Sequence, residues 1–425
     1  MIQLSTVKLY DFSDFSQTVY LSYSLENAME SSYKKTIHAC YTGYIVQAII
    51  NNFAPLLFLT FQNSYNISLS KITMLVTINF GLQLIIDFIS AGFIDKIGYR
   101  VSAVLAHVLC ASGLALMTVL PELFQDPFMG LLTAILVYAA GGGMLEVLVS
   151  PIVEACPTKN KEKTMSLLHS FYCWGFVGVV LISTIFFIQF GINNWKVLAL
   201  IWALVPIYNA YMFAKVPIAP LIAGNEKGLS INELVKHKTF WVFMLLMLCA
   251  GACEQSVAQW ASSFAERGLG AAKTVGDLAG PMFFSIMMGI SRTIYGKYGD
   301  SIDLKKFMLY SGILCVFSYL LISLSPLPVF GFIGCGLCGL SVGILWPGVF
   351  SISSASIKRG GTAMFAFLAL AGDLGCSAGP SYVGLISGTL GDNLKMGILA
   401  AIIFPVMLIT AIISLHLKKN RQENN

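Results

Sequence analysis

The chain has 425 residues, of which 56% are hydrophobic and only 11% are charged. Soluble domains carry about 25% charged residues, so this composition excludes a soluble protein and predicts an integral membrane protein. The formal net charge of +5 comes from basic residues scattered through short loops. Because nucleic-acid binding needs a sustained basic face, we expect no nucleic-acid partner.

Apolar runs of about 20 residues follow one another along the chain and predict membrane-spanning helices rather than barrel strands. Residues 1–35 are polar and are expected to form a cytosolic tail. Met29 begins a compact segment that leads into the first predicted span. Residues 1–28 are therefore a candidate for an N-terminal extension ahead of that segment. Six predicted spans fill the first half: Thr36–Phe61, Ser70–Ile94, Val101–Leu120, Pro127–Val153, Thr164–Phe190 and Trp195–Phe213.

The polar gap at residues 214–238 is the longest internal polar segment and contains four turn formers. Within it, Ser230 and Glu233 have the spacing of a capping box and predict a short surface helix. Six more predicted spans follow: Thr239–Phe264, Gly276–Tyr295, Phe307–Leu324, Pro328–Ala355, Thr362–Leu390 and Asn393–Leu417.

These spans predict an all-α membrane protein with twelve transmembrane helices. We expect two six-helix bundles, at residues 36–213 and 239–417, joined by a cytosolic linker at 214–238. Residues 418–425 would form a second cytosolic tail. Glycines such as Gly141, Gly142 and Gly143 are expected to let neighbouring helices approach closely.

The basic residues predict the orientation, because lysine and arginine favour cytosolic loops. With both termini inside, all but five of the 26 lysines and arginines fall on the inner side. We assign Arg292, near the end of a predicted span, to this inner set. The protein is therefore expected to be a multi-pass protein of the cytoplasmic membrane with both termini in the cytosol. The outer residues are Lys71, Lys196, Arg267, Lys273 and Lys395.

An internal repeat supports the division into two halves. AGFIDKIGYR, Ala91 to Arg100, follows the second predicted span, and GKYGDSIDLKK, Gly296 to Lys306, follows the eighth. Asp95 and Asp300 take matching places in the two copies, about half the chain apart. Two such halves are typical of transporters built from structural repeats.

The first copy resembles the signature loop of the major facilitator superfamily. The matching residues are Asp95, Lys96, Gly98 and Arg100, while Ala91 stands where that family usually has glycine. The resemblance implies the major facilitator fold and a gating loop that acts as a charge-paired latch on the inner gate.

The second copy of the loop keeps Gly296 and Asp300, and we include both in the predicted gating loop. Asp87 lies about 10 Å inside the inner end of its span, from the rise of an α-helix. We expect it to pair at the gate rather than to contact a solute.

The fourth and fifth predicted spans carry a more specific resemblance. Residues 141–151 are similar to the fourth helix of fucose-permease-like proton symporters, which implies a role for Glu146 in proton coupling. Where those symporters have an acidic partner in the first helix, this chain has Asn51 and Asn52. Residues 167–175 resemble a fifth-helix pattern of sugar-porter-like members.

Ionisable and polar side chains gather in a central slab of the predicted spans. Glu146 lies about 12 Å from the inner end of its helix and His169 roughly 8 Å from the start of its own. Intramembrane ionisable residues are costly and point to function. We take Glu146, Glu254, Asp373 and His169 as proton-coupling candidates. The alternative for Glu146 is hydrogen bonding to a neighbouring helix and that for His169 is a purely hydrogen-bonded role, while the glycines around Asp373 could instead serve close helix packing.

Eight residues are candidates for binding a substrate, either by hydrogen bonds or by stacking on a sugar ring. For the amides the alternative is interhelical hydrogen bonding, and for the aromatic residues it is core packing. The candidates are Gln47, Asn51, Asn52, Tyr172, Trp174, Gln255, Trp260 and Trp346.

These observations predict a secondary active transporter that moves a small polar solute, such as a sugar, by alternating access with proton coupling. We expect no lysine or arginine at the midplane, which favours an uncharged solute. A drug or metabolite exporter working as an antiporter, and a non-transporting receptor on the same fold, are the alternatives.

No enzyme motif and no phosphate-cradling loop competes with the transporter interpretation. We expect a monomer in the lipid bilayer whose other partners are the solute and protons, with no cofactor and no metal.

Overall fold

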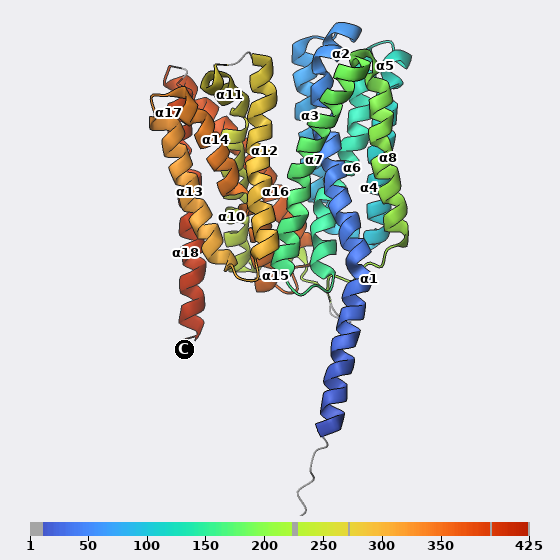
Figure 1. The fold of residues 1–425 in the computed structure, drawn as a ribbon, viewed down its shortest axis with the longest axis vertical. Coiled ribbons are helices and arrows are strands. Elements are labelled where there is room, and N and C mark those ends of the chain that lie inside the picture. Colours follow the sequence, from blue (N-terminus) through green and yellow to red (C-terminus); the bar gives the residue numbers. More distant parts are fainter. Residues whose placement is uncertain (1–11, 223–227, 271–272, 392, 424–425) are drawn as a thin grey trace, which may run out of the picture.

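The computed structural model describes residues 12–222, 228–270, 273–391 and 393–423. Within these residues the regular structure is helical throughout, and eleven helices are long and apolar enough to cross a membrane. Figure 1 shows two groups of helices side by side, one from each half of the chain. The prediction of an all-α membrane protein is confirmed.

In the first half, the described residues form eight α-helices and two short 3₁₀ turns. They are α1 (Phe12–Asn52), η1 (Ala54–Leu57), α2 (Phe58–Tyr65), α3 (Leu69–Ile97), α4 (Tyr99–Met117), α5 (Leu120–Leu123), α6 (Pro127–Ala155), α7 (Lys161–Phe190), η2 (Ile192–Asn194) and α8 (Trp195–Lys215).

From Gly228 onward, the part of the chain that the structure describes forms ten α-helices. They are α9 (Ile231–Lys236), α10 (Lys238–Ala258), α11 (Ala261–Leu269), α12 (Lys273–Tyr298), α13 (Leu304–Leu324), α14 (Pro328–Val342), α15 (Leu345–Ser356), α16 (Gly361–Thr389), α17 (Leu394–Ala400) and α18 (Ile403–Glu423). The predicted eighth span is α12, which packs against α7, α11 and α14.

The capping box predicted at the start of the linker helix α9 is confirmed. The Ser230 hydroxyl accepts a hydrogen bond from the Glu233 backbone N–H, and the Glu233 carboxylate accepts one from the Ser230 backbone N–H at 2.8 Å. These reciprocal bonds satisfy two backbone donors that a helix start leaves open.

Four of the predicted spans contain a short break, although the helices on either side of each break together form one candidate membrane-spanning segment. The first breaks at Phe53, just before Pro55, which lacks a backbone N–H. The seventh, tenth and twelfth spans break after α10, α14 and α17 respectively. Broken helices are tolerated within a membrane protein where neighbouring groups satisfy the freed backbone.

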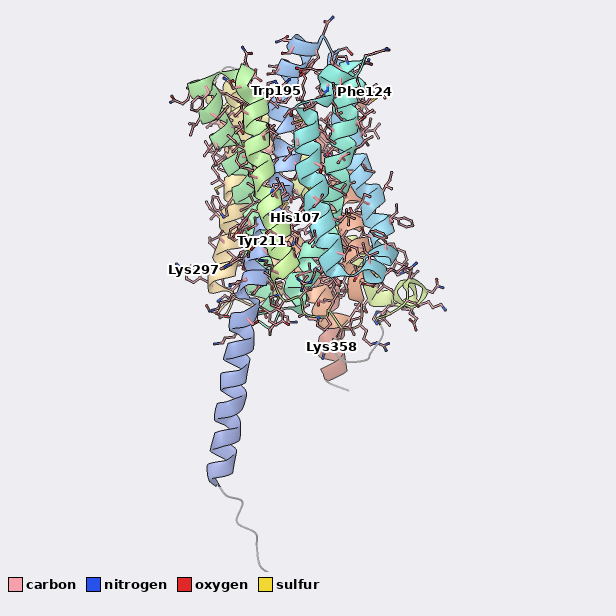
Figure 2. All side chains as sticks on the ribbon, turned by 90° about the vertical axis from the view of Figure 1, so that its right-hand side faces the viewer. His107, Phe124, Trp195, Tyr211, Lys297 and Lys358 are labelled. Carbon is pink, nitrogen blue, oxygen red and sulfur yellow. The ribbon has the colours of Figure 1, made fainter. Side chains whose placement is uncertain are left out.

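The two ends of the molecule can be told apart in the figures. Figure 1 shows the start of α1 and the end of α18 at the same end of the bundles. Figure 2 shows Lys297 and Lys358 toward this end, and Phe124 and Trp195 at the opposite one. We call the end that carries both termini the inner end, following the predicted orientation.

Helices α10 and α16 approach each other closely at glycines. A Cβ atom on Gly375 would lie 2.0 Å from the carbonyl oxygen of Leu248, and one on Gly251 would lie 2.1 Å from that of Gly372. The same holds in the first half, where a Cβ on Gly141 would lie 2.5 Å from the carbonyl oxygen of Ala106. The predicted role of glycines in close helix packing is confirmed at these positions.

We expect Gly375→Ala to destabilise the protein by about 1–3 kcal/mol, the usual cost of overpacking, because backbone atoms of α10 cannot move aside locally. Gly384→Ala, on the same helix with no atom within 4 Å of its Cβ position, is the matched control. It should be neutral or stabilise by about 0.5–1 kcal/mol. Thermal unfolding of the purified protein measures both, and equal melting of the two variants would contradict the packing argument.

Candidate functional site

Glu146 occupies a polar opening in an otherwise buried helix segment. Every residue from Gly141 to Glu154 on α6 is buried except Glu146, which is partly exposed. Gln47 on α1 donates a hydrogen bond from Nε2 to Glu146 Oε2 at 2.7 Å. Gln47 itself is 3% exposed, so its amide is held against the carboxyl by packing.

Two acids from the second half meet Glu146 between the two halves. Glu254 on α10 and Asp373 on α16 are both partly exposed. Asp373 lies close enough to Glu146 and to Glu254 for their charges to interact. Cys376, one turn beyond Asp373, interacts electrostatically with all three. The structure thus brings three of the four proton-coupling candidates together.

Asp87 on α3 is the fourth acid of this group. Its side chain is fully buried, and its carboxyl lies within hydrogen-bonding reach of the Asp373 carboxyl. Glu146 is also near enough to interact with its charge. We call Asp87, Glu146, Glu254 and Asp373 the acid cluster.

Arg292 corrects the prediction that no lysine or arginine lies in the polar centre. It is 4% exposed inside α12, so it does not belong to an inner loop. Its Nη2 lies 3.8 Å from Glu254 Oε2, and its Nε donates to the Gly343 carbonyl at 2.8 Å, at the end of α14. The sequence signal was present, because Arg292 falls within the predicted eighth span.

The Arg292 side chain also joins the two halves. Its Nη1 donates to the His169 backbone carbonyl of α7 at 3.0 Å and contacts Cys173 Sγ at 3.1 Å. Ser166 donates its hydroxyl to the Arg292 carbonyl at 2.8 Å. One buried guanidinium therefore connects an acid of α10, a broken helix and the facing helix α7.

The imidazole of His169 makes contacts with hydroxyl groups rather than with the acid cluster. Its Nε2 lies 3.3 Å from the Tyr44 hydroxyl and 3.4 Å from Ser150 Oγ, and its ring packs on Phe350. The side chain is 4% exposed. This geometry matches the alternative considered for it, a hydrogen-bonded buried histidine.

The two asparagines of α1 face different surroundings. Asn51 Oδ1 accepts hydrogen bonds from Gln83 at 3.0 Å and Asn79 at 3.4 Å, which were not predicted. Asn52 donates to the Ala48 carbonyl at 2.8 Å. Tyr172 on α7 lies close enough to both asparagines and to Glu146 to interact with them, so these residues border the acid cluster.

The remaining candidates divide into two groups. Gln255 donates to Glu254 at 3.4 Å, and Trp346 packs with its ring against Gly372, next to Asp373. Trp174, however, is 38% exposed and donates to Thr293 Oγ1 at 3.1 Å, at the seam of α7 and α12. Its indole therefore lies at this seam, and a stacking role for it stays a prediction.

Trp260 stands at the break between α10 and α11. Its Nε1 is buried and has no hydrogen-bond partner among the described residues. Gln47 Oε1 is likewise buried and has no hydrogen-bond partner among the described residues. Buried polar groups in native proteins normally find a partner, so these two atoms are exceptions to that pattern.

The first copy of the predicted gating loop connects α3 with the second half through hydrogen bonds at the inner end. Thr362, at the start of α16, donates to Asp95 at 2.5 Å and also bonds the Tyr99 hydroxyl. Arg100 donates to the carbonyls of Phe213 and Ala214. Between the helices, Gly98 has φ +85°, a conformation that favours glycine. Lys96, the remaining predicted member, is exposed at the end of α3.

The second copy of the loop, which follows α12, contacts the first half of the chain in the corresponding way. Asp300 forms an ion pair with Lys163 at the start of α7 and accepts a hydrogen bond from Asn160 at 3.0 Å. Lys163 and then Asn160 lower the pKa of Asp300. This tie is therefore formed at neutral pH and is lost only as the pH falls through the depressed pKa. Gly296 packs against Leu167.

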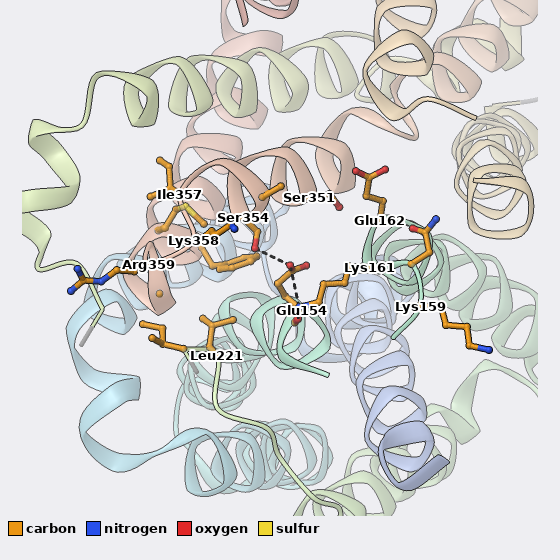
Figure 3. A pocket seen from close by; sticks show the side chains of 16 residues that line it. Glu154, Lys159, Lys161, Glu162, Leu221, Ser351, Ser354, Ile357, Lys358 and Arg359 are labelled. Carbon is orange, nitrogen blue, oxygen red and sulfur yellow. Dashed lines mark hydrogen bonds and ion pairs between the residues drawn. The ribbon is translucent and has the colours of Figure 1, made fainter. Parts of the chain in front are cut away.

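A cavity of about 770 Å³ opens at the inner end between the two halves. Figure 3 shows Glu154 of α6 reaching Ser354 of α15 across it, with Lys161 beside the carboxylate. The exposed side chains of Lys159 and Lys358 line it from opposite halves. The cavity is thus an inner vestibule that is crossed by a further hydrogen bond between the halves.

Comparisons with known proteins agree on one fold. The sequence model of the Major Facilitator Superfamily matches residues 40–380. The fucose:proton symporter FucP of E. coli superimposes with a TM-score of 0.76 at 15% identity, as does FucP in the outward conformation, covering 90% of this chain and 98% of that chain.

The proton:xylose symporter XylE bound to 6-bromo-6-deoxy-D-glucose superimposes with a TM-score of 0.70 at 11% identity, covering 90% of this chain and 95% of that chain. No curated protein matches the chain by sequence. At these identities the structural likeness shows a shared fold.

Proposed function

The chain belongs to the major facilitator superfamily, and from that premise we propose that this multi-pass membrane transporter moves a small polar solute together with protons. The solute class that fits best is an uncharged sugar. We further propose that the protein acts as a monomer in the cytoplasmic membrane with both termini in the cytosol. The bundles at residues 36–213 and 239–417 would be the moving units, joined by the linker at 214–238.

The convergence of partly exposed acids from both halves carries this proposal. Glu146, Glu254 and Asp373 come from three helices and face one another in the interior. An acid persists at such depth when it faces a bundle interior or a wet space. A group of acids that interact there offers sites for a proton to bind and leave.

Hydrogen-bonding groups beside the acids support an uncharged polar solute. Gln47 Oε1 and Trp260 Nε1 are buried without a partner in the described part of the chain, and Tyr172 lies next to Glu146. Arg292 adds a positive charge, but Glu254 and two backbone carbonyls already engage it. The similar folds of FucP, a fucose:proton symporter, and XylE, a proton:xylose symporter, add support.

The ties between the halves support alternating access with the inner end closed in this state. The recorded hydrogen bonds between the halves join the early part of α7 to the end of α12, Glu154 to Ser354, and the α3–α4 corner to Thr362. All these residues lie in the inner half of their helices. Opening the inner end would break them together.

A covalent link across the inner end should stop this movement. A Cβ on Gly296 of α12 would lie 3.1 Å from Leu167 Cβ of α7, near the spacing of about 3.5–4.5 Å that disulfides adopt. We expect oxidised Leu167→Cys/Gly296→Cys to lose solute exchange in proteoliposomes and to regain it with a reductant. Leu167→Cys alone is the control, and exchange that persists in the oxidised double variant would contradict the rocking mechanism.

The substrate class can be tested by ligand stabilisation of the purified protein. A thermal-shift screen would compare sugars, nucleosides, amino acids and hydrophobic cations, because a ligand that binds the folded state raises the melting temperature. We expect a sugar to give the largest shift and to undergo counterflow in proteoliposomes. Broad stabilisation by hydrophobic cations would point instead to an exporter, and stabilisation without counterflow to a receptor.

A further inference from the structure

Helices α3 and α16 form a continuous seam between the two halves. At its inner end Thr362 bonds Asp95. Further in, the rings of Phe88 and Phe367 meet edge to face with centroids 6.2 Å apart. Asp87 directly precedes Phe88, and its carboxyl lies close enough to that of Asp373 for the two to interact. The two carboxyls therefore lie where the halves must separate if the inner end opens.

The described surroundings of Asp87 leave its carboxyl without a hydrogen-bond donor. Its side chain is 0% exposed, and neither of its oxygens has a hydrogen-bond donor among the described residues. Its neighbour within reach is the carboxyl of Asp373. An ionised carboxylate only accepts hydrogen bonds, whereas a protonated one donates through its O–H. A bond between the two therefore requires one proton.

The charged groups around the pair make a second negative charge there unfavourable. Glu146 faces Asp87 from α6, and Glu254 faces Asp373 from α10. From α2 and α4, which also contact α3, no charged group acts on Asp87 in the part of the chain that the structure describes. The buried cation Arg292 pairs with Glu254 instead.

We propose that Asp87 and Asp373 form a proton-binding site that holds α3 and α16 together. With one proton shared, the O–H of one carboxyl donates to the other and the seam stays closed. When that O–H dissociates, the proton passes to water through Asp373, the partly exposed member, and two carboxylates face each other. Like charges that share a site repel, so the inner end opens. This inference rests on the proposed rocking of the two halves.

The test measures the opening of the inner end directly, without any solute. Spin labels on Lys159→Cys and Lys358→Cys report the distance across the inner vestibule, because both side chains are exposed and line it from opposite halves. Nine native cysteines are buried and Cys376 is partly buried. The unsubstituted protein, treated with the same spin label, measures the background labelling of these native cysteines. The full-length protein in lipid nanodiscs is titrated from about pH 5 to about pH 9, the range that buried carboxyls reach.

We expect the labelled parent to change from a short to a long distance across this range. Asp87→Asn and Asp373→Asn each leave one carboxylate beside an amide donor, so each should keep the short distance at every pH. Asp126→Asn is the matched control, since Asp126 is an exposed acid at the outer end that caps α6 and asparagine also caps helices. It should titrate like the parent.

Two results would overturn the inference: a parent distance that does not change with pH, or a change that survives in Asp87→Asn or Asp373→Asn. If one variant does not elute as a folded monodisperse protein, the other decides. Because no solute is present, a failure to find sugar transport would leave this result standing. Conversely, if the protein takes up sugar with protons but the distance between the labels does not change with pH, only this inference is rejected and the proposed function stands.

Discussion

Glu146→Gln is expected to abolish solute accumulation driven by a pH gradient while leaving solute exchange partly intact. Glutamine has nearly the same shape as glutamate, and its carbonyl oxygen can still accept the hydrogen bond that Gln47 donates at 2.7 Å. It cannot bind or release a proton near neutral pH. The site would therefore still hold a solute, but the proton gradient would no longer drive its movement.

The measurement is uptake into proteoliposomes with and without an imposed pH gradient, together with counterflow at equal pH. Glu122→Gln makes the same chemical change at an exposed outer residue paired with Lys196 and serves as the control. For Glu146→Gln we expect gradient-driven uptake at the level of protein-free vesicles. Accumulation equal to that of the unsubstituted protein would remove Glu146 from the coupling mechanism.

Arg292→Met is expected to reduce the free energy of unfolding by about 3–5 kcal/mol, the usual result of leaving a buried charge without its partner. Glu254 would lose the guanidinium 3.8 Å away. The carbonyls of Gly343 and His169 would lose their recorded side-chain donor. Since methionine supplies none of these bonds, the broken tenth span and the seam with α7 should both weaken.

A double-mutant cycle separates the ion pair from the backbone contacts. Adding Glu254→Gln to Arg292→Met removes the unpaired charge, so the double variant should recover part of the lost stability. Chemical denaturation in detergent measures all three variants. Additive losses in the double variant would show that the ion pair contributes nothing, and a fully stable Arg292→Met would show that the whole contact set is dispensable.

The sequence predicts the helices better than it predicts where they break. Runs of apolar residues locate the spans because a bilayer admits only segments that satisfy their own backbone. The breaks after α10 and α14 lie inside apolar runs and carry no proline at the break itself. At Gly343 the freed carbonyl is bonded by Arg292 from another helix, and no local pattern encodes such a partner.

The candidate site shows the same contrast between local and tertiary signals. Glu146 stands out because an ionisable side chain interrupts an apolar run, and the structure places it against Gln47 and near Asp373. Arg292 was assigned to a loop because it lies close to the end of its predicted span. Trp174 faces the α7–α12 seam, and helical periodicity alone does not say which neighbour a face will meet.

Simultaneous recording of solute and proton movement tests the central claim most directly. The sugar that gives the largest thermal shift is added to proteoliposomes without an imposed gradient, while the external pH and internal sugar are followed together. The account predicts that the external medium becomes alkaline as sugar enters, and that Glu146→Gln removes the pH change. Sugar entry with no accompanying movement of protons would contradict it.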